Sequence, residues 1–393
     1  MAGLIITCAA ASGKKNLPVL PSVQKKFTLN KLNRELGYQL IDGGVSVVFV
    51  FDPAVYKIDD TDSVYVEGSF NGWKKGTDES WSMMKFRGSV WTLTKNAEEV
   101  RIPGNSGFPE FKFYVYAGGR KNADEPPAVS DIPGYQMATN NLMLFPGDDP
   151  AVVVANTATA DRVKKLAEFD LNDPAQVSVL TNVRRVPGTT MLWRGYHPYK
   201  KSRGQYDTEQ TRLELVKKSL EMNGIKSIIT LSGDEKPSAA AGESISPYEQ
   251  AIIDAGNELF IDTSYNTVYY HSAEADFGNV IQQIVRFINS HPGPYYIHCR
   301  LGTDRTGVTS AVLAALCGAD WKSIAADYQK TNETGIKEFR DYRLLQYSFE
   351  QMLGKPVADV KDLQQEIGAH FVNGGYLTQQ ELDTLAERLC GAA

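Results

Sequence analysis

A cysteine and an arginine six positions apart, Cys299 and Arg305, have the residue types and the spacing that phosphate-ester hydrolysis requires. A thiolate is a strong nucleophile, and a guanidinium offers two parallel N–H groups to phosphate oxygens. Both side chains can face one bound phosphate if the backbone between them curls into a loop. Residues 298–307 therefore predict a phosphate site with a nucleophilic cysteine, against the alternative of a buried structural cysteine beside a surface arginine.

The segments on either side favour such a loop. Residues 294–297 predict a short buried strand, and residues 308–316 predict an apolar helix. The loop N–H groups would converge at a helix N-terminus, an anion-binding position that also lowers the pKa of a cysteine. Gly302 and Gly307 are expected to provide the backbone freedom of a tight turn. The expected phosphate-binding residues are Arg300, Leu301, Gly302, Thr303, Asp304 and Arg305.

Residues 298–307 resemble the Cys-x5-Arg signature of the protein tyrosine phosphatase superfamily, in the form His-Cys-x-x-Gly-x-Asp-Arg-Thr-Gly. Over residues 180–352 the likeness is to atypical dual-specificity phosphatases of plants and fungi and to bacterial phosphatases. The resemblance implies that Cys299 forms a cysteinyl-phosphate while Arg305 holds two phosphate oxygens. Thr306 is placed to hydrogen-bond the sulfur, and His298 is expected to orient the loop.

The sequence does not single out one residue as the acid that protonates the leaving group. Many members of the superfamily carry an aspartate on a mobile loop well before the cysteine, and three acidic residues precede it here: Asp262, Glu274 and Asp276. None has the usual spacing, and the last two could instead be first-turn acids of the next helix. Asp304 is the stronger candidate, because relatives can use an aspartate directly before the signature arginine. It could equally form a salt bridge with Arg305 or Arg300.

Other basic residues could approach a bound phosphate. Arg194 lies in a predicted strand, residues 191–195, and His197 follows it; structural roles are expected for both. Four more basic residues follow the helix that leaves the loop and could bind a polyanionic substrate: Lys330, Lys337, Arg340 and Arg343. Solvated helix faces have the same pattern, so the sequence leaves both interpretations open.

The sequence of the N-terminal part of the chain predicts mainly β-strands. Predicted strands cover residues 45–51, 63–67, 90–94, 111–116 and 141–145, separated by Gly, Asn, Asp and Pro. Residues 68–73 resemble the Gly-x-Phe-Asn-x-Trp turn of glycogen-binding modules with an early-set, immunoglobulin-like fold. That likeness, over residues 42–146, implies glycan contact by Trp73 and Lys112. The second tryptophan of glycan-binding relatives is replaced by residues 118–121, so Trp73 could instead be a core residue of a scaffold.

We therefore expect an α/β phosphatase domain, a central mixed parallel sheet flanked by helices, preceded by an all-β immunoglobulin-like sandwich. The expected divisions are an N-terminal segment (1–41), the sandwich (42–150), a connection (151–180), the phosphatase domain (181–353) and a helical extension (354–393). Residues 161–169, 208–223, 248–255, 277–290, 321–329, 337–352 and 378–389 predict helices, the last with a Thr378–Glu381 capping box.

Composition excludes several other classes of protein. A net charge of −6 over 393 residues, without a basic face, argues against nucleic acid as a partner. Four scattered cysteines and five scattered histidines predict neither a disulfide framework, a metal site nor a cofactor. No run is long enough to span a membrane. We expect a cytoplasmic protein unless the apolar residues 3–11 are a truncated signal, which would place it in the cell envelope or outside the cell.

The substrate is left open among phosphorylated molecules. The first hypothesis is a cysteine-dependent phosphatase acting on an inositol phosphate, a phosphoinositide headgroup or phosphotyrosine in a protein. A second is a glucan phosphatase guided by the sandwich. A third is a catalytically inactive phosphate-binding module, which the intact Cys299, Arg305 and Thr306 disfavour.

Overall fold

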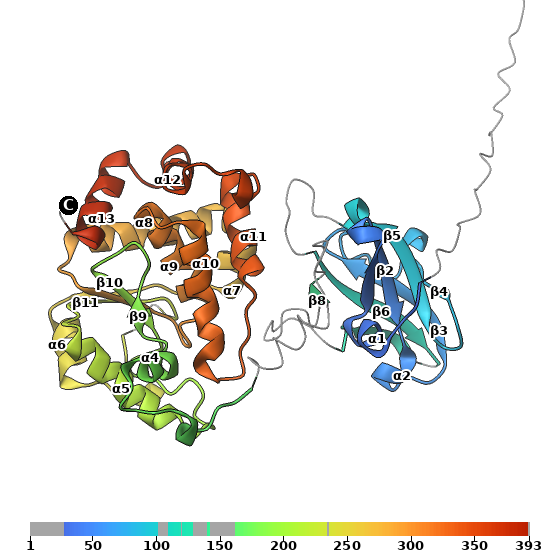
Figure 1. The fold of residues 1–393 in the computed structure, drawn as a ribbon, viewed down its shortest axis with the longest axis horizontal. Coiled ribbons are helices and arrows are strands. Elements are labelled where there is room, and N and C mark those ends of the chain that lie inside the picture. The colour runs from blue at the N-terminus through green and yellow to red at the C-terminus, as the bar shows by residue number, and fades with distance from the viewer. Residues whose placement is uncertain are drawn as a thin grey trace, which may run out of the picture.

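The computed structural model describes residues 27–100, 109–118, 120–128, 140–141, 162–233 and 236–391. They form a β-rich N-terminal domain and an α/β C-terminal domain (Figure 1). No helix in these ranges is long and apolar enough to cross a membrane. The candidate signal at residues 3–11, most of the predicted strand 141–145 and the connection up to residue 161 lie outside the described residues.

The N-terminal domain consists of two antiparallel sheets. One has the order β1 (Tyr38–Ile41), β2 (Ser46–Phe51), β5 (Trp91–Asn96) and β4 (Met84–Lys85). The other has the order β3 (Thr61–Gly68), β6 (Glu110–Ala117) and β7 (Arg120–Glu125), with β8 (Asn140–Asn141) paired to β6. Two short helices, α1 (Lys31–Leu36) and α2 (Pro53–Tyr56), flank β1 and β2.

Aromatic residues hold these two sheets together. Phe49 and Phe51 of β2 contact Phe111 and Phe113 of β6, with ring centroids 5.3 and 5.2 Å apart. The alternate residues of β2 are also buried, because Val48 packs with Val50 in a second small cluster on the opposite face. Burial of both faces explains why the strand is a continuous apolar run rather than an alternating one.

The C-terminal domain is built on a five-stranded mixed sheet, as expected. Its order is β12 (Glu258–Phe260), β11 (Ser227–Thr230), β13 (Tyr295–His298), β10 (Leu192–Gly195) and β9 (Arg184–Arg185). The first four strands are parallel and β9 is antiparallel to β10. The strand that precedes Cys299 is thus the central one.

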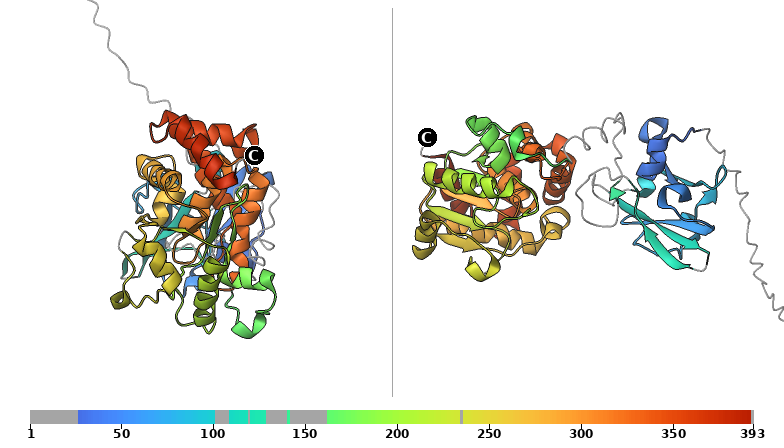
Figure 2. Two further views of the ribbon diagram at one scale, coloured as in Figure 1. Left: turned by 90° about the vertical axis from the view of Figure 1, so that its left-hand side faces the viewer. Right: turned by 90° about the horizontal axis from the view of Figure 1, so that it is seen from below.

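Helices cover both faces of this sheet (Figure 2). Ile228 and Tyr296 pack with residues of α5 (Glu209–Met222) and α6 (Pro247–Asp254) on one face. Ile229 and Ile297 face α8 (Ala275–Ser290) and α9 (Asp304–Leu316) on the other. The remaining helices are α4 (Pro174–Thr181), α7 (Tyr265–Tyr270), α10 (Trp321–Gln329), α11 (Tyr342–Leu353), α12 (Leu363–Asn373) and α13 (Gln379–Cys390). Of these, α12 packs on α9, and α13 packs on α8.

Some local predictions were wrong. The helix predicted over residues 337–352 begins only at Tyr342, because Asp341 caps it and Lys337 has a φ of 60°. The helix predicted over residues 161–169 is a single 3-10 turn, Leu166–Glu168. The sequence predictions missed β1, β4, β7, β9, α2, α4, α7 and α12. The Thr378–Glu381 capping box is confirmed.

Candidate active site

The loop that carries Cys299 leaves the carboxyl end of the central strand β13 and runs into the N-terminus of α9. This is the edge of a parallel sheet at which ligands usually bind. The sequence positions the loop there because the apolar strand ends at His298 and the apolar helix begins at Asp304, which leaves residues 299–303 for the loop.

Four consecutive carbonyl groups of the loop accept hydrogen bonds from outside it. The carbonyl of Cys299 is bound by Nδ1 of His298 at 3.0 Å, and that of Arg300 by Oγ of Ser202 at 2.9 Å. The carbonyl of Leu301 is bound by Nδ2 of Asn182 at 3.0 Å, and that of Gly302 by Nη2 of Arg194 at 2.6 Å. In a trans peptide the N–H points opposite to the C=O. The N–H groups of residues 300–303 therefore point away from these donors.

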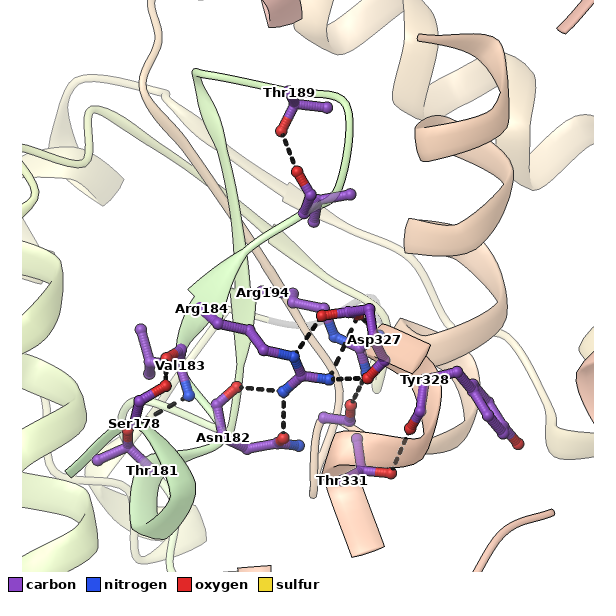
Figure 3. A network of polar contacts seen from close by, with 12 residues as sticks. Ser178, Thr181, Asn182, Val183, Arg184, Thr189, Arg194, Asp327, Tyr328 and Thr331 are labelled. Carbon is purple, nitrogen blue, oxygen red and sulfur yellow. Dashed lines mark hydrogen bonds and ion pairs between the residues drawn. The ribbon is translucent and has the colours of Figure 1, made fainter. Parts of the chain in front are cut away.

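Two of these donors belong to a buried network behind the loop (Figure 3). Nη1 of Arg194 lies 2.9 Å from Oδ2 of Asp327 on α10, and Nε of Arg184 lies 2.5 Å from Oδ1. Arg184 also donates to Asn182. Burial would raise the pKa of Asp327, but the two guanidinium groups outweigh it and lower that pKa. Arg194 thus has the structural role that was expected, and it acts on the loop backbone.

The two glycines of the signature are required for different reasons. Gly302 has a φ of +73°, and a Cβ there would lie 2.3 Å from the carbonyl oxygen of Gly195. Backbone freedom and lack of a side chain are both required at this position. Gly307 lies inside α9 with a helical conformation, and its Cβ would lie 2.9 Å from the ring of Tyr328. The expectation of backbone freedom at Gly307 was therefore wrong, because close packing of Tyr328 is what this position needs.

Cys299 is buried at the base of the loop, with 3% of its surface exposed. Burial alone would raise its pKa, but Arg305 and the hydroxyl and N–H groups of Thr306 lower it below its ordinary value of 9.0. The hydroxyl of Thr306 is itself fully buried and makes no other hydrogen bond within the described part of the chain. These contacts favour the thiolate, which is the nucleophilic form.

A cavity of about 510 Å³ opens above Cys299. It is lined by Arg203, Tyr265, Asn266, Cys299, Arg300, Leu301, Asp304, Arg305 and Arg340. The structure thus brings Cys299, Arg305 and the loop residues 300, 301 and 304 into one pocket. Nη1 of Arg305 donates to the carbonyl of Thr263 at 3.1 Å, a contact that orients its guanidinium.

Asp304 lies in this pocket as the acceptor of three hydrogen bonds. Nε and Nη2 of Arg340 lie 2.6 and 3.2 Å from its two carboxylate oxygens, and the hydroxyl of Tyr269 lies 3.0 Å from Oδ1. Its salt-bridge partner is therefore Arg340 and not Arg305 or Arg300. Arg340 also lies 3.2 Å from Glu338, which in turn pairs with Arg203.

The other acidic candidates lie outside the pocket lining. Asp262 is exposed, in an isolated bridge with Ser232. Glu274 is the exposed N-cap residue of α8 and lies 2.8 Å from Nδ1 of His271. Asp276 is in the first turn of the same helix. Glu274 and Asp276 thus occupy the helix-start positions that were the alternative interpretation.

The basic residues that follow α9 do not gather around the pocket. Lys330 and Lys337 are exposed, and Arg343 forms a local pair with Asp341 at 2.7 Å. Arg340 does line the pocket. Sequence reasoning missed Arg203, whose only signal was its place between a strand and a helix. His197 is buried, with its ring 4.7 Å from that of His298.

In the N-terminal domain, Trp73 and Lys112 are neighbours. Nζ of Lys112 lies 5.7 Å from the ring centroid of Trp73, and it also pairs with Asp124 at 2.9 Å. Asn71 closes the turn by accepting from the N–H of Gly68 at 2.9 Å. Trp73 is half-buried rather than a core residue.

A central parallel strand that ends in a cysteine-bearing, anion-binding loop at a helix N-terminus defines a class of phosphate-handling α/β domain. Residues 208–390, within the C-terminal domain, match the tyrosine phosphatase family. This confirms the resemblance read from the signature loop.

The chain is also similar to solved structures. One is the core catalytic domain of the PP-IP phosphatase SIW14 from S. cerevisiae, in complex with citrate. It is 16% identical, and the match covers 50% of this chain and 94% of that one with a TM-score of 0.28. No curated protein matches the chain. Among the described residues, no group of three or more His, Cys, Asp or Glu side chains could hold a metal ion.

Proposed function

We propose that the protein hydrolyses phosphate monoesters through a cysteinyl-phosphate on Cys299. The observation that carries the proposal is that Cys299 and Arg305 line one cavity together with the loop residues Arg300, Leu301 and Asp304. Nucleophile, charge stabilisation and substrate orientation are then all supplied by side chains and backbone of this chain.

The first step forms a bond between Sγ of Cys299 and phosphorus while the bond from phosphorus to the leaving oxygen breaks. Arg305 binds two equatorial oxygens, and the loop N–H groups bind the developing charge. In the second step water attacks phosphorus, the S–P bond breaks and inorganic phosphate leaves. Thr306 faces the sulfur and stabilises the thiolate that is regenerated.

The leaving oxygen must be protonated or be stable as an anion. Asp304 is held by Arg340 and Tyr269, so we assign it the role of positioning Arg340 in the pocket rather than that of proton donor. Without a positioned acid, the rate depends strongly on the acidity of the leaving group. For substrates that bind equally well, aryl phosphates then have a higher kcat than alkyl phosphates, while the basic residues of the cavity determine which substrate binds most tightly.

The additional cations favour a small molecule with several phosphates, an inositol phosphate or a phosphoinositide headgroup, over phosphotyrosine. Arg300 is exposed and lines the cavity, and Arg203 and Arg340 also line it, each paired with Glu338. A second phosphate could take up charge-assisted hydrogen bonds from these guanidinium groups.

The proposal is tested by phosphate release from a panel of inositol polyphosphates, phosphoinositides, phosphotyrosine peptide and phosphoserine peptide, without added metal. Cys299→Ser should abolish release. Cys317→Ser is the matched control, because Cys317 lies at the other end of α9 and its burial raises its pKa. Equal release by the wild type and Cys299→Ser would refute the mechanism.

The neighbouring Trp73 and Lys112 favour a second candidate, a phosphatase that acts on phosphorylated glucan. An aromatic face beside an amine is a common sugar-contacting arrangement, and Trp73 remains partly exposed. On this account Trp73→Ala lowers phosphate release from phosphorylated glucan more than from a soluble aryl phosphate. Full-length protein that does not bind glucan would exclude this candidate.

A further inference from the structure

Behind the catalytic loop, four polar side chains form a hydrogen-bonded chain that begins at the half-buried Glu258 and ends at the carbonyl of Cys299. Nδ1 of His298 lies 3.0 Å from that carbonyl, and Nε2 lies 2.9 Å from Oγ1 of Thr230. Oγ1 of Thr230 and the hydroxyl of Tyr199 each lie 2.9 Å from Oε1 of Glu258. His298, Thr230 and Tyr199 are all less than 5% exposed.

The four contacts require one proton more than His298, Thr230 and Tyr199 supply. The four contacts need one proton each, whereas a neutral imidazole, a threonine and a tyrosine contribute one donor each. The carbonyl of Cys299 can only accept, so Nδ1 must carry a proton. If the hydroxyl of Thr230 donates its proton to Nε2, it has no proton left to donate to Glu258. A further contact of 3.2 Å between the hydroxyls of Tyr199 and Thr230 increases the shortage.

We propose that Glu258 is a positioning residue that shares one titratable proton with His298 through Thr230, and that this proton secures the carbonyl of Cys299. The inference rests on the proposed function only for its effect on rate. In the proton-complete state Glu258 donates to Thr230, Thr230 donates to Nε2 of His298, and Nδ1 donates to the carbonyl.

The environment places the shared proton on Glu258 near neutral pH. Burial raises the pKa of Glu258 to about 7, and burial lowers that of His298 to about 4. One oxygen of Glu258, Oε2, is buried without a hydrogen-bond partner in the described structure. The charged or titratable groups that face this chain are Glu243 and Glu249 near Glu258, Arg305 and His197 near His298, and Lys200 and Arg300 near His197.

Loss of the proton at higher pH removes one of the four contacts. The carboxylate then attracts the hydroxyls of Thr230 and Tyr199, because charge-assisted hydrogen bonds are the stronger ones. His298 keeps a single N–H, which can serve Thr230 or the carbonyl of Cys299 but not both. The backbone at the nucleophile is therefore held less firmly above the pKa of Glu258.

The direct test is the ring nitrogen NMR spectrum of full-length protein labelled with ¹⁵N-histidine, recorded across neutral pH. The signals of His298 are assigned by their loss in His298→Asn. We expect the His298 ring nitrogens to shift with a midpoint near that of Glu258, and to stop shifting in Glu258→Gln. His298 signals that do not change between about pH 6 and about pH 8 in the wild type would overturn the proposal. This test does not depend on turnover.

Kinetics provide the second readout. With an aryl phosphate that is already a dianion, kcat should decline by up to about tenfold between about pH 6 and about pH 8, following the protonated fraction of Glu258. In Glu258→Gln the amide donates to Thr230 without ionising, so the ratio of the two kcat values should approach one. A protein without turnover but with the expected NMR shifts would refute the phosphatase and keep the shared proton.

Glu249→Gln is the matched control. Glu249 is also buried on the same side of the sheet, and burial also raises its pKa to about 7, but it caps α6 through Ser246 and has no hydrogen bond to the chain. Its charge raises the pKa of Glu258, so the Glu249→Gln variant should keep the decline in kcat and the His298 shifts, with both midpoints moved to lower pH. If Glu258→Gln does not fold, Thr230→Val breaks the chain at its centre and should also abolish the shifts. Loss of the decline in Glu249→Gln alone would contradict the proposal.

Discussion

Nη2 of Arg194 lies 2.6 Å from the carbonyl oxygen of Gly302, while Nη1 of the same guanidinium lies 2.9 Å from Asp327. One buried side chain thus connects the loop that carries Cys299 to α10. The planar fork of an arginine can serve both partners at once, whereas a lysine offers a single point charge. Asp327 compensates the charge of Arg194 and is itself held by Arg184, so the loop carbonyl has a preorganised donor.

Arg194→Lys should therefore lower kcat about a hundredfold, because a small displacement of the loop misaligns the reacting groups. It should also lower the free energy of unfolding by about 2 kcal/mol through the lost buried hydrogen bond. Steady-state kinetics and urea unfolding measure the two effects. Arg185→Lys, an exposed substitution on the same strand pair, is the control and should change neither. Wild-type kcat in Arg194→Lys would show that the loop does not need this donor.

Gly302→Ala should reduce activity by about two orders of magnitude, because the new methyl group meets the backbone of Gly195 and the φ is left-handed. The free energy of unfolding should fall by about 1–3 kcal/mol from the strained backbone. Gly204→Ala is the control, since a Cβ there meets nothing. Comparable losses in both variants would mean that alanine in place of glycine is harmful for reasons unrelated to the loop.

The lowered pKa of Cys299 predicts thiolate reactivity near neutral pH. Iodoacetamide should alkylate Cys299 faster than Cys317, whose pKa is raised by burial. Between the folded pKa and the ordinary value of 9.0, folding favours the thiolate, so this contribution to stability is complete above 9.0 and is lost as pH falls through the folded pKa. Arg305→Gln should move the alkylation profile to higher pH. An unchanged profile would exclude Arg305 as the group that lowers the pKa.

Asp304→Asn distinguishes the two roles considered for this residue. If Asp304 positions Arg340, the substitution lowers kcat by a similar factor for aryl and alkyl phosphates, because the salt bridge is weakened in both cases. If it is the proton donor, the loss is about 10²–10⁴-fold for alkyl phosphates and small for aryl phosphates. We expect the similar factor, and a selective loss on alkyl phosphates would restore Asp304 as the acid.

The loop itself could be predicted because its functional residues are contiguous. Cys299, Arg305 and Thr306 lie within eight residues between an apolar strand and an apolar helix, and all three meet at one site in the structure. Their supports could not be predicted in the same way. Asn182 and Ser202 bind loop carbonyls from 119 and 98 residues away, and nothing local marks an asparagine or serine for such a contact.

The missed helices show a similar limit. The sequence of α4, PAQVSVLT, has little apolar periodicity. Its start could have been predicted only from Asp173 as the N-cap and Pro174 at the first helical position. The composition of α7 is aromatic and β-branched, as in a strand, yet Ser264 caps it through the N–H of Thr267 at 3.0 Å. Capping contacts determine that these short segments are helical, whereas a long amphipathic segment such as α8 is helical because its apolar face packs on the core.

The most direct test of the central claim is to capture the covalent intermediate. Wild-type protein turning over an aryl phosphate is quenched rapidly in acid, digested and examined by mass spectrometry, with Cys299→Ser in parallel. We expect a phosphoryl group on the peptide that contains Cys299 in the wild type and none at that position in the variant. Turnover without a phosphoryl group on Cys299, or with one on another residue, would contradict the account.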